Sequence, residues 1–302
     1  SFEVLPGETV CLVGESGCGK SMTALSLMGL LPKTATARAG RIVLSGRDLQ
    51  LTSSKSLNAL RGDRMTMIFQ EPMTALNPLH TVGHQIAEPL RLHLGLSAAE
   101  ARQRALQLLE RVQVPQAARR LDSYPHQLSG GQRQRVVIAI ALACGPDLLI
   151  ADEPTTALDA TVQREVLELI SELVAERGMG LLLISHNLAV VARTVRRLMV
   201  MYGGIVAEAG PTEGVFQRLA HPYTRALFKS RPRLGLPRGT RLATIAGRVP
   251  ELVDLPTGCP FADRCERVID ACRQAVPPPI TVASAHLARC IRAHETPQAH
   301  GA

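Results

Sequence analysis

The chain has 302 residues, of which 46% are hydrophobic and 20% are charged, so we expect a globular protein with a sizeable core and not a disordered chain. The formal net charge is +8, but the arginines are scattered, and aromatic residues make up only 3%, which argues against base-stacking surfaces for single-stranded nucleic acid. We find no signal-peptide pattern and no apolar run long enough to span a bilayer.

A phosphate-binding loop is the first feature along the chain. The apolar strand Val10–Val13 leads into a glycine-rich loop, and a helix over 20–31 follows, which is the context that a P-loop needs. The glycines turn successive backbone N–H groups toward phosphate oxygens, Lys20 reaches the β- and γ-phosphates, and the Ser21 hydroxyl holds Mg²⁺. A glycine-rich turn without a ligand is the competing interpretation. The loop, which matches the P-loop pattern in full, is Gly14-Glu15-Ser16-Gly17-Cys18-Gly19-Lys20-Ser21.

The middle of the chain is predicted to be mostly helical. Residues 64–69 have the pattern of a strand, and Gln70 after it is, by itself, only a loop amide. Between 71 and 146 apolar residues recur at helical spacing, and Ser97 with Glu100 predicts a capping box at the start of one helix.

A second phosphate-binding pattern lies at 128–132, in the sequence Leu-Ser-Gly-Gly-Gln. Gly130 and Gly131 expose backbone N–H groups, and Ser129 supplies a hydroxyl. A helix that begins near Gln132 points its positive end the same way. A helix-capping Ser-Gly turn explains the hydroxyl but not the whole pattern, which arises by chance in a chain of this length about once in several thousand.

A parallel sheet covered by helices is predicted for the next part of the chain. The apolar runs 148–151 and 181–184 are typical of buried parallel strands, and an amphipathic helix over 162–174, ended by Gly178, joins them. Residues 199–209 then predict a hairpin around two adjacent glycines.

Chemically useful side chains follow both of these predicted strands. Asp152 at the tip of the first strand would meet a magnesium ion, and Glu153 would accept the proton of an attacking water. His186 follows the second strand, where an imidazole could donate a hydrogen bond to the γ-phosphate. A lone histidine is more often a structural residue, so His186 by itself is a weak candidate.

Four of the seven cysteines lie in the last segment, which follows a stretch rich in proline and arginine that begins near residue 230. A cytosolic setting argues against disulfides and for a metal centre. Four thiolates can hold a 4Fe–4S cluster or a tetrahedral Zn²⁺ ion, and spacing does not separate these two from unmetallated thiols. A metal centre would replace the core that so short a segment lacks. The four are Cys259, Cys265, Cys272 and Cys290.

Together these patterns resemble the nucleotide-binding subunits of ATP-binding cassette (ABC) transporters, over nearly the whole chain. The resemblance implies a P-loop NTPase (RecA-like) α/β core with an inserted helical subdomain and a small Cys-rich C-terminal module. The core would comprise 1–70 and 147–228, the helical subdomain 71–146 and the C-terminal module 229–302. The motifs, in the order of the family, are the P-loop, Gln70, Leu128–Gln132, Asp152-Glu153, Ala157-Leu158-Asp159 and Ser185-His186.

In that family two cassettes pair head to tail, and each ATP lies between the P-loop of one and the signature motif of the other. The resemblance therefore implies that Ser129, Gly130, Gly131 and Gln132 contact the partner's ATP, with Asp159 at the interface. It makes Glu153 the base and His186 a γ-phosphate contact. Ser21, Gln70 and Asp152 become the magnesium site, and Gln70 also links catalysis to the membrane subunits.

Two features depart from the family pattern. An adenine-stacking aromatic residue precedes the P-loop strand in the family, and we expect its equivalent upstream of Ser1. Asn187 follows His186, where aspartate is commoner.

The segment His221–Leu227 and the Gly-Cys-Pro-Phe sequence at 258–261 are similar to dipeptide and oligopeptide importer ATPases. This similarity favours the 4Fe–4S cluster over Zn²⁺. It implies an ATP hydrolase bound peripherally at the cytoplasmic face of the bacterial inner membrane. Its partners would be a second ATPase subunit, two transmembrane permease subunits and an external solute-binding protein. The solute, the choice between homodimer and heterodimer, and the activity of both ATP sites stay open.

Two other functions are compatible with parts of the sequence. A soluble ABC ATPase that acts on nucleic acid or ribosomes is permitted by the +8 charge, but such proteins usually carry two cassettes or long insertions. A redox protein built around the cluster would have no use for a complete set of ATPase motifs. We therefore expect no nucleic-acid partner.

Overall fold

The computed structural model describes residues 1–35, 39–70, 75–156, 158–186, 188, 191, 194–230, 244–251 and 253–295. The chain divides into two compact units, of which the first comprises Ser1–Thr9 and Met22–Leu183 and the second Val10–Ser21 and Ile184–Ala302. Among the described residues, no helix has both the length and the apolar character that a bilayer crossing requires.

The first unit is built on parallel strands. β4 (Met65–Ile68) pairs in parallel with β5 (Leu148–Asp152), and β6 (Gly180–Ile184) lies on the other side of β5. All three were predicted as strands, and β5 and β6 are buried along almost their whole length. Strands with helices on both faces have no solvent-facing side, which is why their sequences are continuous apolar runs.

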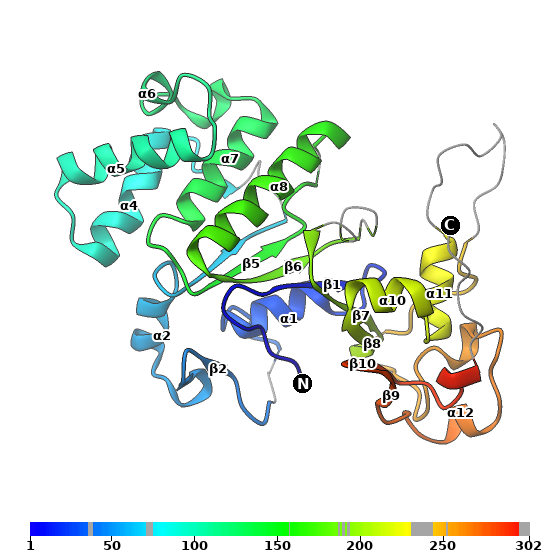
Figure 1. Cartoon of the computed structure of the whole chain (residues 1–302). Coiled ribbons are helices and arrows are strands. Elements are labelled where there is room, and N and C mark those ends of the chain that lie inside the picture. Colours follow the sequence, from blue (N-terminus) through cyan, green and yellow to red (C-terminus); the bar gives the residue numbers. More distant parts are fainter. Residues whose placement is uncertain are drawn as a thin grey trace. The chain divides into compact units, whose positions relative to one another are not determined.

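Helices make up most of the described part of 71–146, as predicted. They are α4 (Val82–Leu94), α5 (Ala98–Arg111), α6 (Ala117–Arg120) and α7 (Gly130–Ala141), of which α4, α5 and α7 contact one another (Figure 1). The capping box is confirmed, because Ser97 Oγ accepts the Glu100 N–H at 3.3 Å and Glu100 Oε2 accepts the Ser97 N–H at 2.9 Å. α8 (Ala160–Arg177), which contacts α7, ends at Gly178 in the left-handed conformation, as expected.

The helix after the glycine-rich loop is shorter than predicted. α1 covers Lys20–Leu27, whereas the apolar pattern predicted a helix to residue 31. The chain leaves the helix at Gly29, which has a φ of 63°, and the Leu30 N–H turns back to the Leu25 carbonyl oxygen at 2.8 Å. This local glycine geometry ends a helix whatever the hydrophobic spacing beyond it. The first unit also holds β2 (Val43–Leu44), β3 (Arg47–Asp48), a 3-10 turn at Leu49–Leu51 and α2 (Ser54–Leu60).

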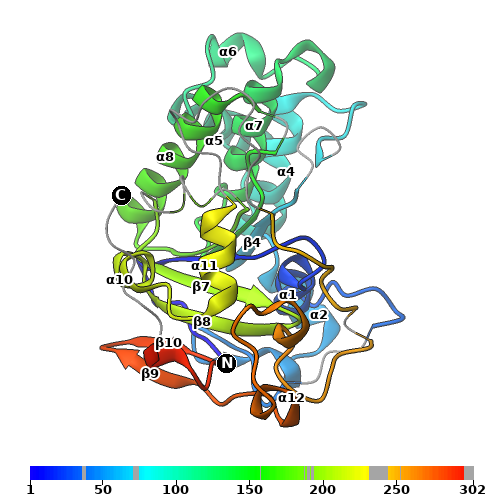
Figure 2. The same cartoon turned by 90° about the vertical axis from the view of Figure 1, so that its right-hand side faces the viewer.

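The second unit contains a mixed sheet. β1 (Thr9–Val13) pairs in parallel with β7 (Arg197–Tyr202), which forms the predicted hairpin with β8 (Ile205–Pro211). The hairpin turns at Gly203 and Gly204, which have φ values of 51° and 76°. α10 (Thr212–Arg218) and α11 (Pro222–Lys229) contact β8 (Figure 2).

The end of the chain joins this same sheet. β10 (His286–Ala288) pairs with β8 and with β9 (Ile280–Ala283), so the predicted C-terminal module contributes strands to the sheet of the hairpin. The short 3-10 and α-helical turns before and after these strands are Ala262–Arg264, Ala271–Gln274 (α12) and Ala293–Glu295. The proline- and arginine-rich stretch at 231–243 lies outside the described residues.

A buried carboxylate anchors the tail. Glu208 on β8 is fully buried and accepts the backbone N–H groups of Ala220 and His221 at 2.9 and 2.8 Å. Its Oε1 also lies 2.8 Å from His286 Nε2 on β10. A buried carboxylate is stable only when it is fully hydrogen-bonded, so this side chain ties β8, α11 and β10 together.

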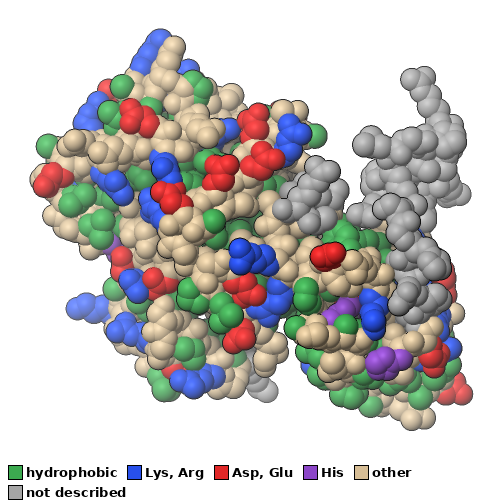
Figure 3. Space-filling model, viewed as in Figure 1, with side chains coloured by type: hydrophobic (Ala, Val, Ile, Leu, Met, Phe, Trp, Pro, Cys, Tyr) green, Lys and Arg blue, Asp and Glu red, His purple; other side chains and the backbone are tan. Residues whose placement is uncertain are grey.

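The charged surface of the first unit mixes both signs on the face in view. Figure 3 shows basic and acidic side chains intermingled there. Ion pairs within this unit include Arg135 with Glu165 at 3.1 Å and Arg102 with Asp122 at 2.8 Å. On this face the excess of arginine therefore does not gather into a single basic field.

Candidate nucleotide site and cysteine cluster

The glycine-rich loop follows β1 and leads into α1, as predicted. A Cβ on Gly14 would lie 2.3 Å from the Met201 carbonyl oxygen and 2.8 Å from Cys18 Sγ, so only glycine fits there. Gly17 and Gly19 have φ values of 82° and 102°, which other residues rarely adopt. Gly17 is exposed, so the turn of the loop faces solvent, where a ligand can reach it.

Lys20 is held across this loop. Its side chain is 7% exposed, and Nζ donates hydrogen bonds to the carbonyl oxygens of Gly14 at 2.9 Å and Glu15 at 3.0 Å. Both acceptors are neutral carbonyl groups, so these two hydrogen bonds place no negative charge beside the ammonium. Ser21 follows it at the start of α1 and is half-buried.

The structure brings Gln70 and Glu153 together. Gln70 Nε2 donates to Glu153 Oε2 at 3.2 Å, and Thr156 Oγ1 donates to the same oxygen at 3.1 Å. Glu153 has a φ of 47°, a left-handed conformation that is strained for a residue with a side chain. Asp152, the last residue of β5, is 3% exposed. Strain of this kind persists where the surrounding structure fixes the residue, often at a functional site.

The Leu-Ser-Gly-Gly-Gln motif forms the start of α7. Ser129 is the exposed N-cap residue, and its hydroxyl and the Gln132 side chain form a reciprocal capping box at 3.3 and 3.2 Å. A Cβ on Gly131 would lie 3.0 Å from Val162 Cγ1 on α8, so this glycine also permits a close helix contact. The sequence motif thus has a structural use in addition to the predicted one.

The remaining predicted residues of the nucleotide site lie at element ends. Asp159 is the N-cap of α8, where Oδ1 accepts the N–H groups of Thr161 and Val162 at 3.1 and 3.0 Å. His186 is exposed after β6, and the Ser185 N–H before it donates to the Leu12 carbonyl oxygen at 3.3 Å. Ala157 and Asn187 lie outside the described residues.

The four cysteines of the tail line one cavity, together with His221 and Phe261; they are Cys259, Cys265, Cys272 and Cys290. Burial raises the pKa of Cys259 to about 11, and the three other thiols add to this shift. Three of the sulfurs accept a backbone N–H from the residue two positions on, namely Phe261, Arg267 and Arg292. Among the described residues, no three His, Cys, Asp or Glu side chains are placed so that they could hold a metal ion.

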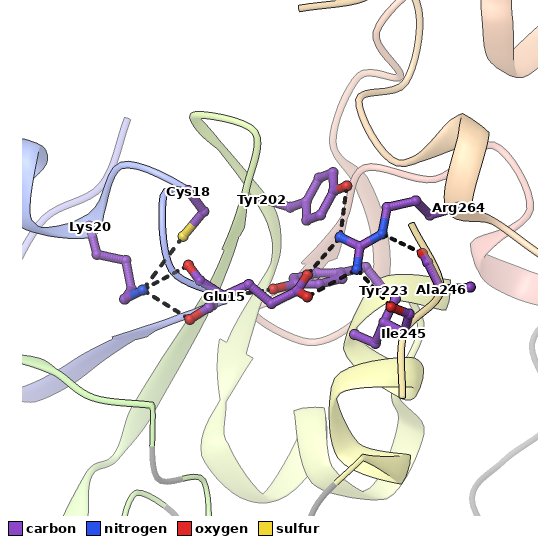
Figure 4. A network of polar contacts seen from close by, with 9 residues as sticks. Glu15, Cys18, Lys20, Tyr202, Tyr223, Ile245, Ala246 and Arg264 are labelled. Carbon is purple, nitrogen blue, oxygen red and sulfur yellow. Dashed lines mark hydrogen bonds and ion pairs between the residues drawn. The ribbon is translucent and has the colours of Figure 1, made fainter. Parts of the chain in front are cut away.

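Sequence reasoning missed a network that joins the tail to the P-loop (Figure 4). Arg264, in the turn between Cys259 and Cys265, forms a bidentate ion pair with Glu15 at 2.8 and 3.0 Å. The Glu15 N–H donates to Tyr223 Oη at 2.8 Å, so this loop N–H is engaged by protein. No local pattern could have signalled a pair 249 residues apart.

Comparisons with known proteins agree with these features. The ABC transporter family matches residues 1–156, and the C-terminal region of oligopeptide/dipeptide transporters matches residues 207–272. A putative peptide import ATP-binding protein of Brucella melitensis is 52% identical over 97% of this chain and 90% of its own length. The dipeptide transport ATP-binding proteins DppD of Bacillus subtilis and Escherichia coli are 47% and 46% identical, each over 96% of this chain and over 87% and 88% of their own lengths.

Among solved structures, the chain is similar to the ATP-binding cassette MJ0796. A dimeric structure of a post-hydrolysis state bound to ADP and Pi has a TM-score of 0.62 and 29% identity, covering 70% of this chain and 88% of that one. A second dimeric structure of this bacterial ABC transporter cassette has a TM-score of 0.61 and 30% identity over the same shares. With the motifs in the family's order and these matches along the chain, the protein belongs to the ABC transporter family and is an ATP-binding, ATP-hydrolysing member of it.

Proposed function

We propose that this protein is the ATPase subunit that powers import of peptides, or of related small solutes, through a separate membrane permease. The names of its relatives support this function, and so does the match of its C-terminal region to oligopeptide/dipeptide transporters. None of the relatives compared above favours the alternative of an ATPase that acts on nucleic acid. The transported solute is selected by subunits other than this one.

The contact between Gln70 and Glu153 carries the catalytic part of the proposal. The two side chains lie 3.2 Å apart at the carboxyl ends of the neighbouring parallel strands β4 and β5, which is where such sheets bind and convert ligands. Glu153 accepts a proton from a water molecule, whose oxygen attacks the γ-phosphorus. The bond from this phosphorus to the bridging oxygen breaks, and ADP and phosphate leave.

The other residues of the site bind ATP and its metal. Lys20 neutralises phosphate charge, and His186 donates a hydrogen bond to the γ-phosphate. The hydroxyl of Ser21, the amide oxygen of Gln70 and the carboxylate of Asp152 are the hard oxygen ligands that suit Mg²⁺. When bound, Mg²⁺ offsets the negative charge of the β- and γ-phosphates.

Two cassettes work as a pair in this proposal, as in the dimeric MJ0796 structures. The ATP held by one P-loop meets Ser129, Gly130, Gly131 and Gln132 of the partner, and Asp159 lies at their interface. The exposed position of Ser129 suits this role. The pair sits on the cytoplasmic face of the bacterial inner membrane, against two permease subunits that receive solute from an external binding protein.

A Glu153→Gln substitution tests the catalytic assignment. The amide keeps the shape of the side chain but accepts a proton poorly, so ATP hydrolysis is expected to fall by about 100-fold or more. MgATP affinity is expected to stay within about twofold, because the phosphate contacts remain. The measurements are phosphate release and equilibrium binding of MgATP. Hydrolysis at the rate of the unaltered protein would refute Glu153 as the base.

Although no three of the described His, Cys, Asp or Glu side chains are placed as they stand to hold a metal ion, we also propose, from the similarity to importer ATPases, that the four tail cysteines hold a metal centre, with a 4Fe–4S cluster preferred and Zn²⁺ as the alternative. The thiols line one cavity, and backbone N–H groups donate to three of the sulfurs, as is usual where thiolates bind a cluster. Such a centre would have a structural role, since it would join Cys259, Cys265, Cys272 and Cys290.

Metal analysis of anaerobically purified protein tests this assignment. A cluster predicts about four iron and four sulfide per chain. Cys265→Ser should lower both contents, whereas Cys144→Ser, outside the tail, should leave them unchanged. Stoichiometric zinc without iron would exclude the cluster, and the absence of any metal would refute the centre altogether.

A further inference from the structure

The guanidinium of Arg264 donates hydrogen bonds through all three of its nitrogen atoms. Nη1 and Nη2 bind Glu15 Oε2 and Oε1 at 2.8 and 3.0 Å, and Nη1 also donates to Tyr202 Oη at 3.1 Å. Nε donates to the Ala246 carbonyl oxygen at 2.8 Å, and Nη2 donates to the Ile245 carbonyl oxygen at 3.2 Å. These contacts engage all five N–H donors, so the position of the guanidinium is fixed by the fold (Figure 4).

This ion pair is shielded from water. The Arg264 side chain is 5% exposed and that of Glu15 is 27% exposed. The guanidinium also lies over the rings of Tyr202 and Phe261, at 5.7 and 5.9 Å from their centroids. A bidentate pair in this setting is much stronger than an exposed one, which salt and water weaken.

Glu15 belongs to the P-loop itself, and the rest of its contacts hold its backbone. Its carbonyl oxygen accepts from Lys20 Nζ at 3.0 Å, and its N–H donates to Tyr223 Oη at 2.8 Å. The segment that carries Arg264 also supports the loop by a second route. Pro260 packs against Gly203, since a Cβ added to Gly203 would lie only 2.8 Å from the Cβ of Pro260. The next residue, Gly204, donates its N–H to the Cys18 carbonyl oxygen in the P-loop at 3.1 Å.

The Glu15 carboxylate is a negative charge within the loop that is predicted to bind the ATP phosphates, and Arg264 is its ion-pair partner. A loop that binds a triphosphate also carries a carboxylate, and like charges near one another in a partly buried site repel strongly. We propose that Arg264 is a positioning residue of the nucleotide site: it cancels the charge of Glu15 and holds its carboxylate away from the ATP phosphates. The cysteine-bearing tail thereby sets the ATP affinity of the P-loop. This inference rests on the proposed role of the loop in binding the phosphates of ATP.

A pair of single substitutions and their combination test this inference. Arg264→Gln leaves a carboxylate without its cation and is expected to raise the dissociation constant and KM for MgATP by roughly tenfold. Glu15→Gln leaves the Arg264 cation without its carboxylate, so by the same electrostatic argument the dissociation constant and the KM should fall and not rise. In the combined variant both charges are absent, so both constants should lie close to those of the unaltered protein. The kcat should stay within about twofold in all three, because Glu153 is untouched.

A second comparison does not depend on the folding of Arg264→Gln. Glu15→Asp keeps the charge but is one methylene shorter, so the bidentate pair cannot form. It is expected to weaken MgATP binding several-fold, although Glu15→Gln does not. Arg273→Gln is the matched control, because Arg273 lies in the same tail segment and its ion pair with Asp263 is exposed; it should leave binding unchanged.

The results separate this inference from the proposed function. Lys20→Ala should weaken MgATP binding; if it does not, the P-loop assignment itself is wrong. If Lys20→Ala weakens binding but Arg264→Gln and Glu15→Asp do not, only the role of Arg264 is refuted. An affinity of the combined variant as low as that of Arg264→Gln would also overturn it, because the effect would then not act through the carboxylate.

Discussion

Single residues in this protein combine observed structural roles with predicted functional ones. Ser129 and Gln132 cap α7, Asp159 caps α8, and all three carry predicted roles toward ATP or the partner cassette. An N-cap side chain sits beside backbone N–H groups that no helical partner satisfies. The residue types that suit capping, with a free hydroxyl, amide or carboxylate, are therefore also those that suit contact with a ligand at the same helix end.

Variants of Asp159 test its helix-capping role separately from its predicted role at the cassette interface. Asp159→Ala removes the acceptor for the N–H groups of Thr161 and Val162 and is expected to lower the free energy of unfolding by about 1 kcal/mol. Asp159→Asn keeps a hydrogen-bond acceptor and should lower the free energy of unfolding by only about a few tenths of 1 kcal/mol. Urea unfolding without nucleotide measures both changes. An equal loss of stability in the two variants would contradict the capping role.

At the scale of elements, the regular parts of the structure follow from sequence spacing. The strands β1, β5 and β6 and the β7–β8 hairpin lie where apolar runs and paired glycines predicted them. The error in the length of α1 has a local cause, since Gly29 ends it while apolar residues continue. Hydrophobic spacing reports which face is buried, but a glycine in the left-handed conformation decides where a helix stops.

The contact between the P-loop and β7 gives a test at this scale. Gly14→Ala would place a methyl group 2.3 Å from the backbone oxygen of Met201, so a strand or the loop must move. We expect a loss of about 2–4 kcal/mol in the free energy of unfolding and weaker MgATP binding. Gly40→Ala is the control, because nothing lies within 4 Å of its Cβ. Matching urea midpoints for the two variants would show that the loop does not need glycine at this position.

At the scale of the whole molecule, the proposal requires two cassettes for each complete ATP site. Glu153→Gln therefore gives a second measurement besides hydrolysis. Because it should bind MgATP without consuming it, we expect a dimer that forms only with MgATP, detected by light scattering after size-exclusion chromatography. A variant that stays monomeric at saturating MgATP, both alone and when mixed with a related cassette chain, would count against pairing through the signature motif.

The structure of the whole molecule also shows what stabilises the tail. Its sequence predicted a small Cys-rich module too short for a core of its own, and in the structure β9 and β10 extend the sheet that contains β7 and β8. A small buried cluster of Ala220, Val282, Ala288 and Ala293 accompanies them. The tail thus has apolar support in addition to any metal centre, and Arg264 connects it to the P-loop.

Sequence by itself determined which chemical groups the motifs supply: a glycine-rich loop with the P-loop pattern, a carboxylate pair after a buried strand, and four thiols in the tail. These patterns are local, because they report backbone geometry and burial within a few residues. Only the tertiary structure decided that Gln70 meets Glu153 across 83 residues and that Arg264 meets Glu15 across 249. Such pairs depend on where the chain folds back on itself, and no spacing along the sequence encodes that distance.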